Sequence, residues 1–534
     1  MAASLSLGRV ERGRRLRRVP LVTVGLALLV TAGVLLPPAY LVLRAAGEGS
    51  NIWSTLTDDS TIKALWRTLL LTSTVTTSCV ALGIPLAWLT VRTDLPFRSL
   101  MTVLLALPLA VPTFVGGFII ISALGPGGLL QDLLEPIGVE RLPSIYGFWG
   151  AWGALTFLSY PLVYLQARSA LLRADPALEE AARSVGKNAR ETFWRVNLPQ
   201  LRPSVSAGAI LVALYVLSEF GAVSMLRYDT LTPLVYIQYA TRFDRSFAAI
   251  LGLPLITLAV LIVMIDSLTR GQARYHARGQ LRPAAILKLG RWRWPLLGVS
   301  MIPVVLGIGM PVAVIVYWLI KGLQLGQSVN FVEEGMIHSA QVAVIAALVA
   351  VTAALPVAIL SARHPGWGSG VLEKFAYAGQ ALPGITIALA LVFFVANYAT
   401  PIYQTLGVLI FAYVVRFLPE AVGACRSAML QVNPNTEEAA RSLGAAPLRV
   451  FFTVTLPQLL PGMSAGALLV ALTAMKELPM TLLLSPIGFD TLATQIWSAT
   501  SEAFFTRAAL PSLLLVALSG TAVFLMLRRE RMGR

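Results

Sequence analysis

The sequence has few of the residues from which soluble enzymes build their surfaces and active sites. Only 13% of its 534 residues are charged, whereas 56% are hydrophobic, so the folded chain cannot cover itself with polar surface. Three histidines and two cysteines lie far apart, at His276, His338, His364, Cys79 and Cys425. They support neither a disulfide framework nor a thiolate metal site. A Gly-x4-Gly-Lys-Ser/Thr phosphate loop is also missing. We therefore expect a membrane protein that is not an enzyme and binds no cofactor of its own.

Long apolar runs recur along the chain, and each could cross a hydrocarbon layer of about 30 Å as a helix. Strands of a membrane barrel would alternate apolar and polar residues, which these runs do not. The sequence thus predicts an all-α polytopic protein with about twelve transmembrane helices. The predicted spans are 19–43, 65–89, 100–124, 145–166, 204–226, 247–268, 295–320, 337–360, 375–398, 404–418, 461–484 and 508–527.

The net charge of +16 follows membrane topology rather than a nucleic-acid surface, so we expect no nucleic-acid partner. Six arginines between Arg9 and Arg18 precede the first span, which places the N-terminus in the cytoplasm. With twelve spans, most Lys and Arg residues then fall on the inner side, and the C-terminus is cytoplasmic too. The Ala- and Arg-rich composition suggests a bacterial plasma (inner) membrane. A cleaved signal peptide is the alternative for the first span, but Ala45-Ala46-Gly47 is a poor cleavage site.

The chain repeats itself at an offset of 258 residues (437 minus 179). Glu-Glu-Ala-Ala-Arg-Ser-Val-Gly at 179–186 returns as Glu-Glu-Ala-Ala-Arg-Ser-Leu-Gly at 437–444. Both copies follow the fourth predicted span of their half, which indicates a parallel duplication of six helices.

The repeat divides the chain into two halves joined by a basic linker. The predicted regions are a cytoplasmic N-terminus at 1–18, a first half at 19–268, a cytoplasmic linker at 269–294, a second half at 295–527 and a cytoplasmic C-terminus at 528–534. The linker's Arg274, Arg278, Arg282, Lys288, Arg291 and Arg293 suit anionic lipid headgroups.

Each half carries a short cytoplasmic elbow, at about 175–203 and 433–461. Asp175-Pro176 and Asn433-Pro434 place a capping side chain before a proline that can begin a helix. Gly186 and Gly444 allow the chain to leave that helix, and a second short helical segment leads to the next span. The pattern predicts a helix-turn-helix in both loops.

The pattern Glu-Ala-Ala-x3-Gly-x9-hydrophobic-x-Leu-Pro occurs in both elbows and resembles the loop signature of ABC importer permeases. The resemblance implies the type I importer permease fold. It also implies two copies of a cytoplasmic ABC ATPase subunit, which use ATP and Mg, and an extracytoplasmic substrate-binding protein. The residues that would couple the chain to the ATPases are Glu180, Ala181, Ala182, Gly186, Leu198, Pro199, Glu438, Ala439, Ala440, Gly444, Leu456 and Pro457.

Two carboxylates lie inside predicted spans at equivalent positions, Glu219 and Glu477. Ionisable groups there mark either a transport pathway or an internal structural contact, and the sequence leaves both readings open. The segments around them resemble fused ferric-iron permeases, and Fe(III) prefers oxygen ligands such as these carboxylates with Tyr215 and Tyr228. The same frame serves permeases for polyamine, thiamine, phosphonate or sulfate. A secondary transporter driven by an ion gradient is the alternative from another class.

Overall fold

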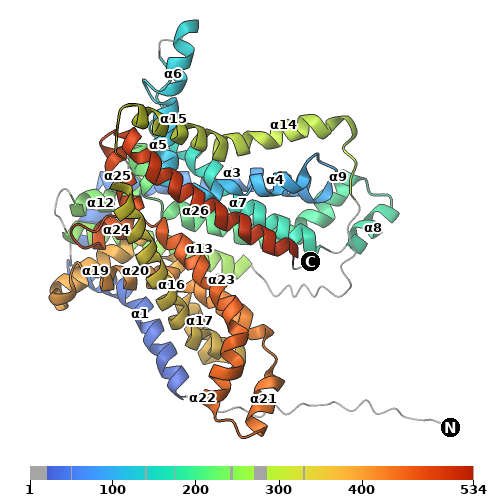
Figure 1. Ribbon diagram of the computed structural model, residues 1–534, viewed down its shortest axis with the longest axis vertical. Coiled ribbons are helices and arrows are strands. Elements are labelled where there is room, and N and C mark those ends of the chain that lie inside the picture. The colour runs from blue at the N-terminus through green and yellow to red at the C-terminus, as the bar shows by residue number, and fades with distance from the viewer. Residues whose placement is uncertain are drawn as a thin grey trace.

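The computed structural model describes residues 21–49, 51–138, 141–174, 176–240, 245–269, 286–328 and 331–532. Within these residues the chain is built of helices, and the only β-type pairing is an isolated parallel bridge. Long helices run side by side in two groups, with short helices at their ends (Figure 1). This confirms the predicted all-α class, since helices satisfy their own backbone polar groups in lipid.

The helices of the first half are α1 (Leu21–Ala46), α2 (Asn51–Leu56), α3 (Asp59–Arg92), α4 (Arg98–Leu104), η1 (Leu107–Ala110), α5 (Thr113–Leu124), α6 (Leu129–Leu134), η2 (Glu135–Ile137), α7 (Phe148–Arg173), α8 (Pro176–Ser184), α9 (Ala189–Thr192), η3 (Phe193–Asn197), α10 (Leu198–Leu217), α11 (Gly221–Met225), α12 (Leu231–Ala240) and α13 (Arg245–Thr269).

Those of the second half are η4 (Gly290–Trp292), α14 (Arg293–Val304), η5 (Val305–Gly309), α15 (Met310–Gln324), α16 (Phe331–Arg363), α17 (Trp367–Ala376), α18 (Ala378–Ala381), α19 (Gly384–Tyr398), η6 (Thr400–Ile402), α20 (Leu406–Gln431), α21 (Pro434–Ser442), α22 (Pro447–Val450), η7 (Phe451–Thr455), α23 (Leu456–Met475), α24 (Pro479–Leu484), α25 (Leu492–Ser501) and α26 (Phe505–Met532).

Ten helical stretches among the described residues are long and apolar enough to cross a bilayer, and a bent pair from α17 to α19 would make eleven. The predicted span 145–166 accounts for the difference from twelve. It corresponds to α7, which has 26 residues but carries polar groups such as Gln166 and Arg168. α7 nevertheless lies between α3 and α10, in the centre of the first half.

Four of the predicted spans are broken, at matching places in the two halves. The ranges 100–124 and 375–398 break before Pro112 and Pro383, after which α5 and α19 begin. Proline lacks an N–H and its ring crowds the preceding turn, which favours a break at these points, although α7 and α20 continue through Pro161 and Pro419. The ranges 204–226 and 461–484 break next to Glu219 and Glu477.

The first membrane helix of each half packs on the other half. α1 contacts α16 and α19 of the second half, together with α13. α15 contacts α5 of the first half, together with α26. In Figure 1, α1 accordingly lies beside α16 and α17, and α15 lies beside α5. The exchange joins the two halves into one apolar core.

The predicted termini and linker are only partly described. The N-terminal arginines and the linker residues Arg274, Arg278 and Arg282 lie outside the described residues. The linker is described from residue 286 onward, where Leu287 forms the parallel bridge with Thr93 at the end of α3.

Small residues bring α20 and α23 into close contact in the second half. A Cβ atom added to Gly466 would lie 2.8 Å from the Cβ atom of Ala424, and one added to Gly462 would overlap Ala428. Small residues four positions apart let helix backbones approach each other in membranes, where packing replaces the hydrophobic drive. In the second half α16, α20 and α23 pack against one another, and in the first half α3, α7 and α10 do the same.

We predict that Gly462→Val destabilises the protein in detergent by about 1–3 kcal/mol, because the added atoms overpack the α20–α23 contact. The measurement is the thermal unfolding midpoint of the purified chain. Gly298→Val is the control, since a Cβ at Gly298 meets nothing within 4 Å. Equal midpoints for the two variants would contradict the close packing of α20 on α23.

Candidate functional site

The two elbows are formed by α8, α9 and η3 in the first half and by α21, α22 and η7 in the second. The side chain of Asn433 accepts a hydrogen bond from the N–H of Asn435 at 3.0 Å, as predicted for a capping residue before Pro434. Asp175, the predicted cap of α8, lies outside the described residues. In Figure 1, α8 lies at the right-hand edge of the molecule and α21 at its bottom.

Each elbow turns at a glycine in the left-handed region. Gly186 has φ +82° and Gly444 has φ +86°. In the first elbow, Gly186 N–H donates to the Arg183 carbonyl at 3.0 Å and Lys187 N–H donates to the Ala182 carbonyl at 3.2 Å. The second elbow repeats both bonds. Other residues are strained at such φ values, so these glycines set the turn.

Buried ion pairs fasten both elbows to the membrane helices. Glu179 lies 3.4 Å from Nη1 of Arg92, at the end of α3, and 3.3 Å from Arg183. Glu437 lies 3.1 Å from Nη2 of Arg363, at the end of α16. Because a carboxylate buried without its partner is costly, these pairs fix where each short helix sits.

The anchoring carboxylates are not those selected from the sequence motif. The structure places the anchor one residue earlier, at Glu179 and Glu437, whereas Glu180 and Glu438 are exposed. The helical spacing in the sequence could have identified Glu179 as the buried residue, because Glu179 and Ala182 are three residues apart and therefore lie on the same face of α8. Ala182 is buried on that face as well.

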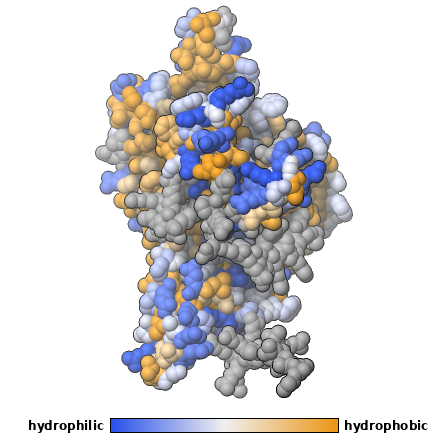
Figure 2. Space-filling model, turned by 90° about the vertical axis from the view of Figure 1, so that its right-hand side faces the viewer, coloured by the Kyte–Doolittle hydropathy of each residue, from blue (hydrophilic) through white to orange (hydrophobic). Residues whose placement is uncertain are grey.

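The remaining motif residues are mostly accessible on the outer face of the elbows. Exposed apolar side chains surround them in both copies, with Val185 73% and Leu443 89% accessible. Figure 2 looks onto the side of the molecule on which α8 lies and shows hydrophilic and hydrophobic residues intermixed there. Exposed motif residues are Ala181, Gly186, Ala439, Gly444 and Pro457, and half-buried ones are Ala440, Leu198, Pro199 and Leu456.

A wide helical turn precedes each Leu-Pro pair. η3 and η7 are π-helical, with the N–H of Leu198 donating to the Phe193 carbonyl and that of Leu456 donating to the Phe451 carbonyl. Pro199 has no N–H to offer the carbonyl of Arg195, and its ring needs room, so the turn widens. The Leu-Pro pair therefore specifies how the elbow joins α10 or α23.

Glu219 occupies the break between α10 and α11 and is buried. Its carboxylate accepts a hydrogen bond from Thr113 Oγ1 at 2.8 Å and from the N–H of Ala222 at 2.9 Å. Its carbonyl oxygen accepts from the hydroxyl of Thr232. The carboxylate thus satisfies the free N–H groups at the start of α11 and ties α11 to α5.

Glu477 occupies the equivalent break between α23 and α24. Its Oε1 accepts from the N–H of Met480 at 3.4 Å, and its carbonyl accepts from Thr481 Oγ1 at 2.6 Å. A Cβ at Gly384 would lie 2.6 Å from Oε1. Gly384 starts α19, as Thr113 starts α5. The first half therefore places a hydrogen-bonding hydroxyl beside its glutamate, whereas the second half places a glycine that only leaves room for the carboxylate.

The two carboxylates interact electrostatically across the boundary between the halves. The hydroxyl of Tyr215, one turn before Glu219, interacts with Thr113 and with both carboxylates. Tyr228 lies elsewhere: its ring stands 5.9 Å from the guanidinium of Arg67 and 5.8 Å from the ring of Phe148. The structure therefore groups three of the four predicted pathway residues.

Three further charged residues join this group, all from the second half. Lys476 Nζ donates to the carbonyl of Leu109, in the first half, at 3.0 Å. Glu420 accepts from Thr473 Oγ1 at 3.0 Å. Arg416, one turn before Glu420 on α20, interacts electrostatically with Glu420 and Glu477. At the 258-residue offset the first half has Leu158, Leu162 and Ser218 instead, and that difference was visible in the sequence.

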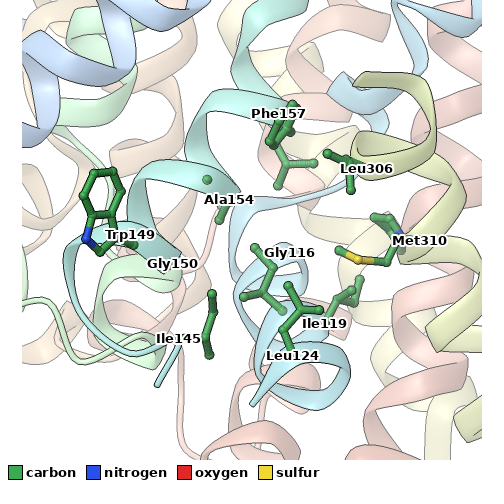
Figure 3. Close-up of a pocket in the computed structure, with 14 residues that line it drawn as sticks. Gly116, Ile119, Leu124, Ile145, Trp149, Gly150, Ala154, Phe157, Leu306 and Met310 are labelled. Atoms are coloured by element: carbon green, nitrogen blue, oxygen red, sulfur yellow. The ribbon is translucent and has the colours of Figure 1, made fainter. Parts of the chain in front are cut away.

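Two cavities are lined by residues outside this charged group. One of about 160 Å³ is apolar and lies between α5, α7 and the η5–α15 segment, with Ile119, Trp149 and Met310 in its wall (Figure 3). Another of about 530 Å³ opens between α20 and α23 at their elbow ends, where Ser427, Gln431 and Gln458 line it. Among the described residues, no cluster of three or more His, Cys, Asp or Glu side chains could hold a metal ion.

Comparisons with known proteins agree with the duplicated arrangement. The family described as "Binding-protein-dependent transport system inner membrane component" matches residues 79–269 and 354–529. The chain is 36% identical over 516 residues to an Fe(3+)-transport system permease protein, FbpB 2, of Haemophilus influenzae, covering 96% of this chain and 98% of that protein. A sulfate transport permease, CysW, of Synechococcus elongatus is 32% identical over 48% of this chain and 93% of its own length. A probable molybdenum ABC transporter permease of Haloferax volcanii is 30% identical over 48% and 94%.

We predict that Glu179→Ala loosens α8 while Glu180→Ala does not. Removing Glu179 leaves Arg92 as an uncompensated buried charge, which costs about 3–5 kcal/mol. Hydrogen exchange across 176–186 should therefore accelerate strongly in Glu179→Ala and stay at the wild-type rate in Glu180→Ala, whose carboxylate is exposed. Equal exchange in the two variants would show that the Arg92 pair does not hold the elbow.

Proposed function

We propose a transport mechanism for this chain from the premise that it belongs to the family of binding-protein-dependent transport system inner membrane components. It is the multi-pass permease subunit of an ATP-binding-cassette importer, not an enzyme. Its two six-helix halves form the route for the substrate. Such permeases work with an ATPase and with a substrate-binding protein.

The elbows are the docking points for two copies of the cytoplasmic ATPase subunit, one for each half. This assignment is supported by their shared geometry: a projecting short helix, an accessible face with exposed apolar side chains, and a buried ion pair to a membrane helix. An exposed apolar patch rimmed by polar residues is typical of an interaction surface. The anchors at Glu179 and Glu437 would transmit force from the ATPases to α3 and α16.

The elbow side faces the cytoplasm, together with both termini. The positive charges of the sequence support this orientation, because in the predicted topology most Lys and Arg residues fall in the loops and ends on the same side as the elbows. In Figure 1 the first residues of α1 lie near α22, and α26 runs toward the right-hand part of the molecule, where α8 lies. The binding protein would dock on the opposite side, where α12 and α25 lie.

Movement of the halves relative to each other would open the route alternately to the two sides. ATP binding would draw the two ATPases and hence the two elbows together. The cavity between α20 and α23, about 530 Å³ and open at the elbow ends, would be part of the inner mouth. The charged group around Glu219 and Glu477 would lie farther out along the same route.

Ferric iron is the proposed substrate. The observation that carries this proposal is the full-length likeness to an Fe(3+)-transport permease, because the other relatives named above match only half of the chain. The charged group between the halves supports a cation: Glu219, Glu420 and Glu477 oppose Arg416 and Lys476. Carboxylate and hydroxyl oxygens suit hard Fe(III).

An oxyanion importer is the second candidate, favoured by the sulfate and molybdenum permeases among the relatives. Polyamine, thiamine and phosphonate remain alternatives within the class. A secondary transporter driven by an ion gradient would need no elbows for an ATPase, so the two matching elbows argue against it.

We predict that radiolabelled Fe(III) uptake in iron-starved cells without this chain is restored by the wild type but not by a Gly186→Ala, Gly444→Ala variant. Alanine at these φ values costs about 1–2 kcal/mol at each turn, which should distort both elbows. Gly49→Ala is the matched control, because Gly49 has φ +54° in open space away from the elbows.

The host strain must lack other iron routes, and membrane levels of each variant must be equal. Iron uptake that is the same with and without the chain would rule out the ferric assignment. Sulfate, molybdate, polyamine and thiamine uptake would then be measured in the same strains.

We predict that Glu219→Gln combined with Glu477→Gln lowers iron uptake at least tenfold with little effect on folding. Glutamine keeps an oxygen that accepts from Thr113 and from the backbone N–H groups, but it removes both charges. Uptake and substrate-stimulated ATPase activity are the measurements, and Glu373→Gln, a half-exposed partner of Arg426, is the control. Unchanged uptake and ATPase activity in the double variant would make the two carboxylates purely structural.

A further inference from the structure

The described end of the linker is hydrogen-bonded to the chain that follows α3. The N–H of Leu287 donates to the carbonyl of Arg92 at 2.8 Å, and the N–H of Asp94 donates to the carbonyl of Leu287 at 3.1 Å. The N–H of Leu289 donates to Oδ1 of Asp94 at 2.7 Å. We call residues 287–289 the strap.

The strap meets the first elbow at its anchor, Arg92. The side chain of Arg92 is 2% exposed, and its guanidinium pairs with Glu179 of α8 at 3.4 Å. Its carbonyl accepts the hydrogen bond from Leu287. One residue is therefore held by the linker at its backbone and by α8 at its side chain. Because the buried guanidinium must stay with its carboxylate, a shift of the strap carries α8 with it.

The second elbow has the same anchor, but no comparable strap among the residues that the structure describes. Arg363 at the end of α16 pairs with Glu437 at 3.1 Å, as Arg92 pairs with Glu179. Two residues after Arg363 stands Pro365, at the position of Asp94 after Arg92. Proline has no N–H, so it cannot make the bond that Asp94 donates to Leu287.

Contacts within the second half hold Arg363 and its partner Glu437 in place. Nη2 of Arg363 also donates to the carbonyl of Val432, just before α21, at 3.1 Å. Glu437 in turn accepts from Thr455 Oγ1, in η7, at 3.1 Å. These contacts stay within the second half, whereas the strap belongs to the segment that joins the halves.

The strap leads without a gap into the first membrane helix of the second half. After Leu289 the chain forms η4 and then α14, η5 and α15, and α15 packs on α5 and α26. We infer that the strap ties the first elbow to the α14–α15 helix of the second half, so that the two elbows are not mechanically equivalent.

This inference rests on the proposed role of the elbows for its consequence in transport, but not for its structural content. α8 would move together with α14, while α21 would move only with its own half. Two elbows that carry the same motif would therefore transmit different movements from the two ATPases. The difference originates in the linker and not in the motif.

Hydrogen exchange of the full chain in lipid nanodiscs tests the strap directly. Leu287→Pro removes the N–H that donates a hydrogen bond to the carbonyl of Arg92. Leu287→Ala keeps this N–H and serves as the matched control. Exchange across 176–186 in α8 should rise severalfold in Leu287→Pro, stay unchanged in Leu287→Ala, and stay unchanged across 434–444 in both. Should Leu287→Pro fail to fold, Asp94→Ala removes the acceptor of Leu289 and should give a smaller rise with the same distribution.

Unchanged exchange in α8, or an equal rise in α8 and α21, would overturn the inference. A second measurement separates it from the proposed function: ATP hydrolysed per ion transported, in proteoliposomes with the ATPase and binding protein. We expect this ratio to rise severalfold in Leu287→Pro. A local rise of exchange in α8 with an unchanged ratio would support the strap and contradict the role of that elbow in coupling.

Discussion

The structure depends on a constraint of the lipid phase: a backbone N–H or carbonyl exposed by a break in a helix must find a partner inside the protein. The chain breaks its membrane helices at matching places in both halves. At one pair of breaks, Glu219 and Glu477 accept hydrogen bonds from the helix that follows. These carboxylates are also the ones proposed above to line the substrate route. Structural and transport roles are thus compatible in the same residues.

The breaks place the charged group at the boundary between the halves. Lys476 crosses that boundary to the carbonyl of Leu109, and Glu219 and Glu477 interact across it. Because this group is built from both halves, the distances between its members must change whenever the halves move relative to each other. Its charge is also unequal, since Arg416, Glu420 and Lys476 all come from the second half. Each half therefore contributes one carboxylate at an equivalent break, and the second half alone adds three further charged residues.

The two elbows share their turn and their anchor but differ in their contact with the linker. Both turn at a glycine with positive φ, and both are fastened by a buried carboxylate one residue before the recognisable motif. The described end of the linker then joins the first, where Asp94 offers an N–H that Pro365 lacks in the second. In a chain with fused halves, the linker between them can therefore take part in transmitting movement to an elbow.

The sequence by itself determined the helical class, the duplication, the elbows and the positions of the two membrane carboxylates. These follow from local properties: apolar length, glycine and proline chemistry, and a repeat that can be compared with itself. It did not separate Glu179 from Glu180, because their roles depend on which side chain meets Arg92 at the end of a distant helix. Nor did it reveal the charged partners on α20, the exchange of first helices or the strap. Those contacts join residues far apart in the chain, and only the packing of the helices decides them.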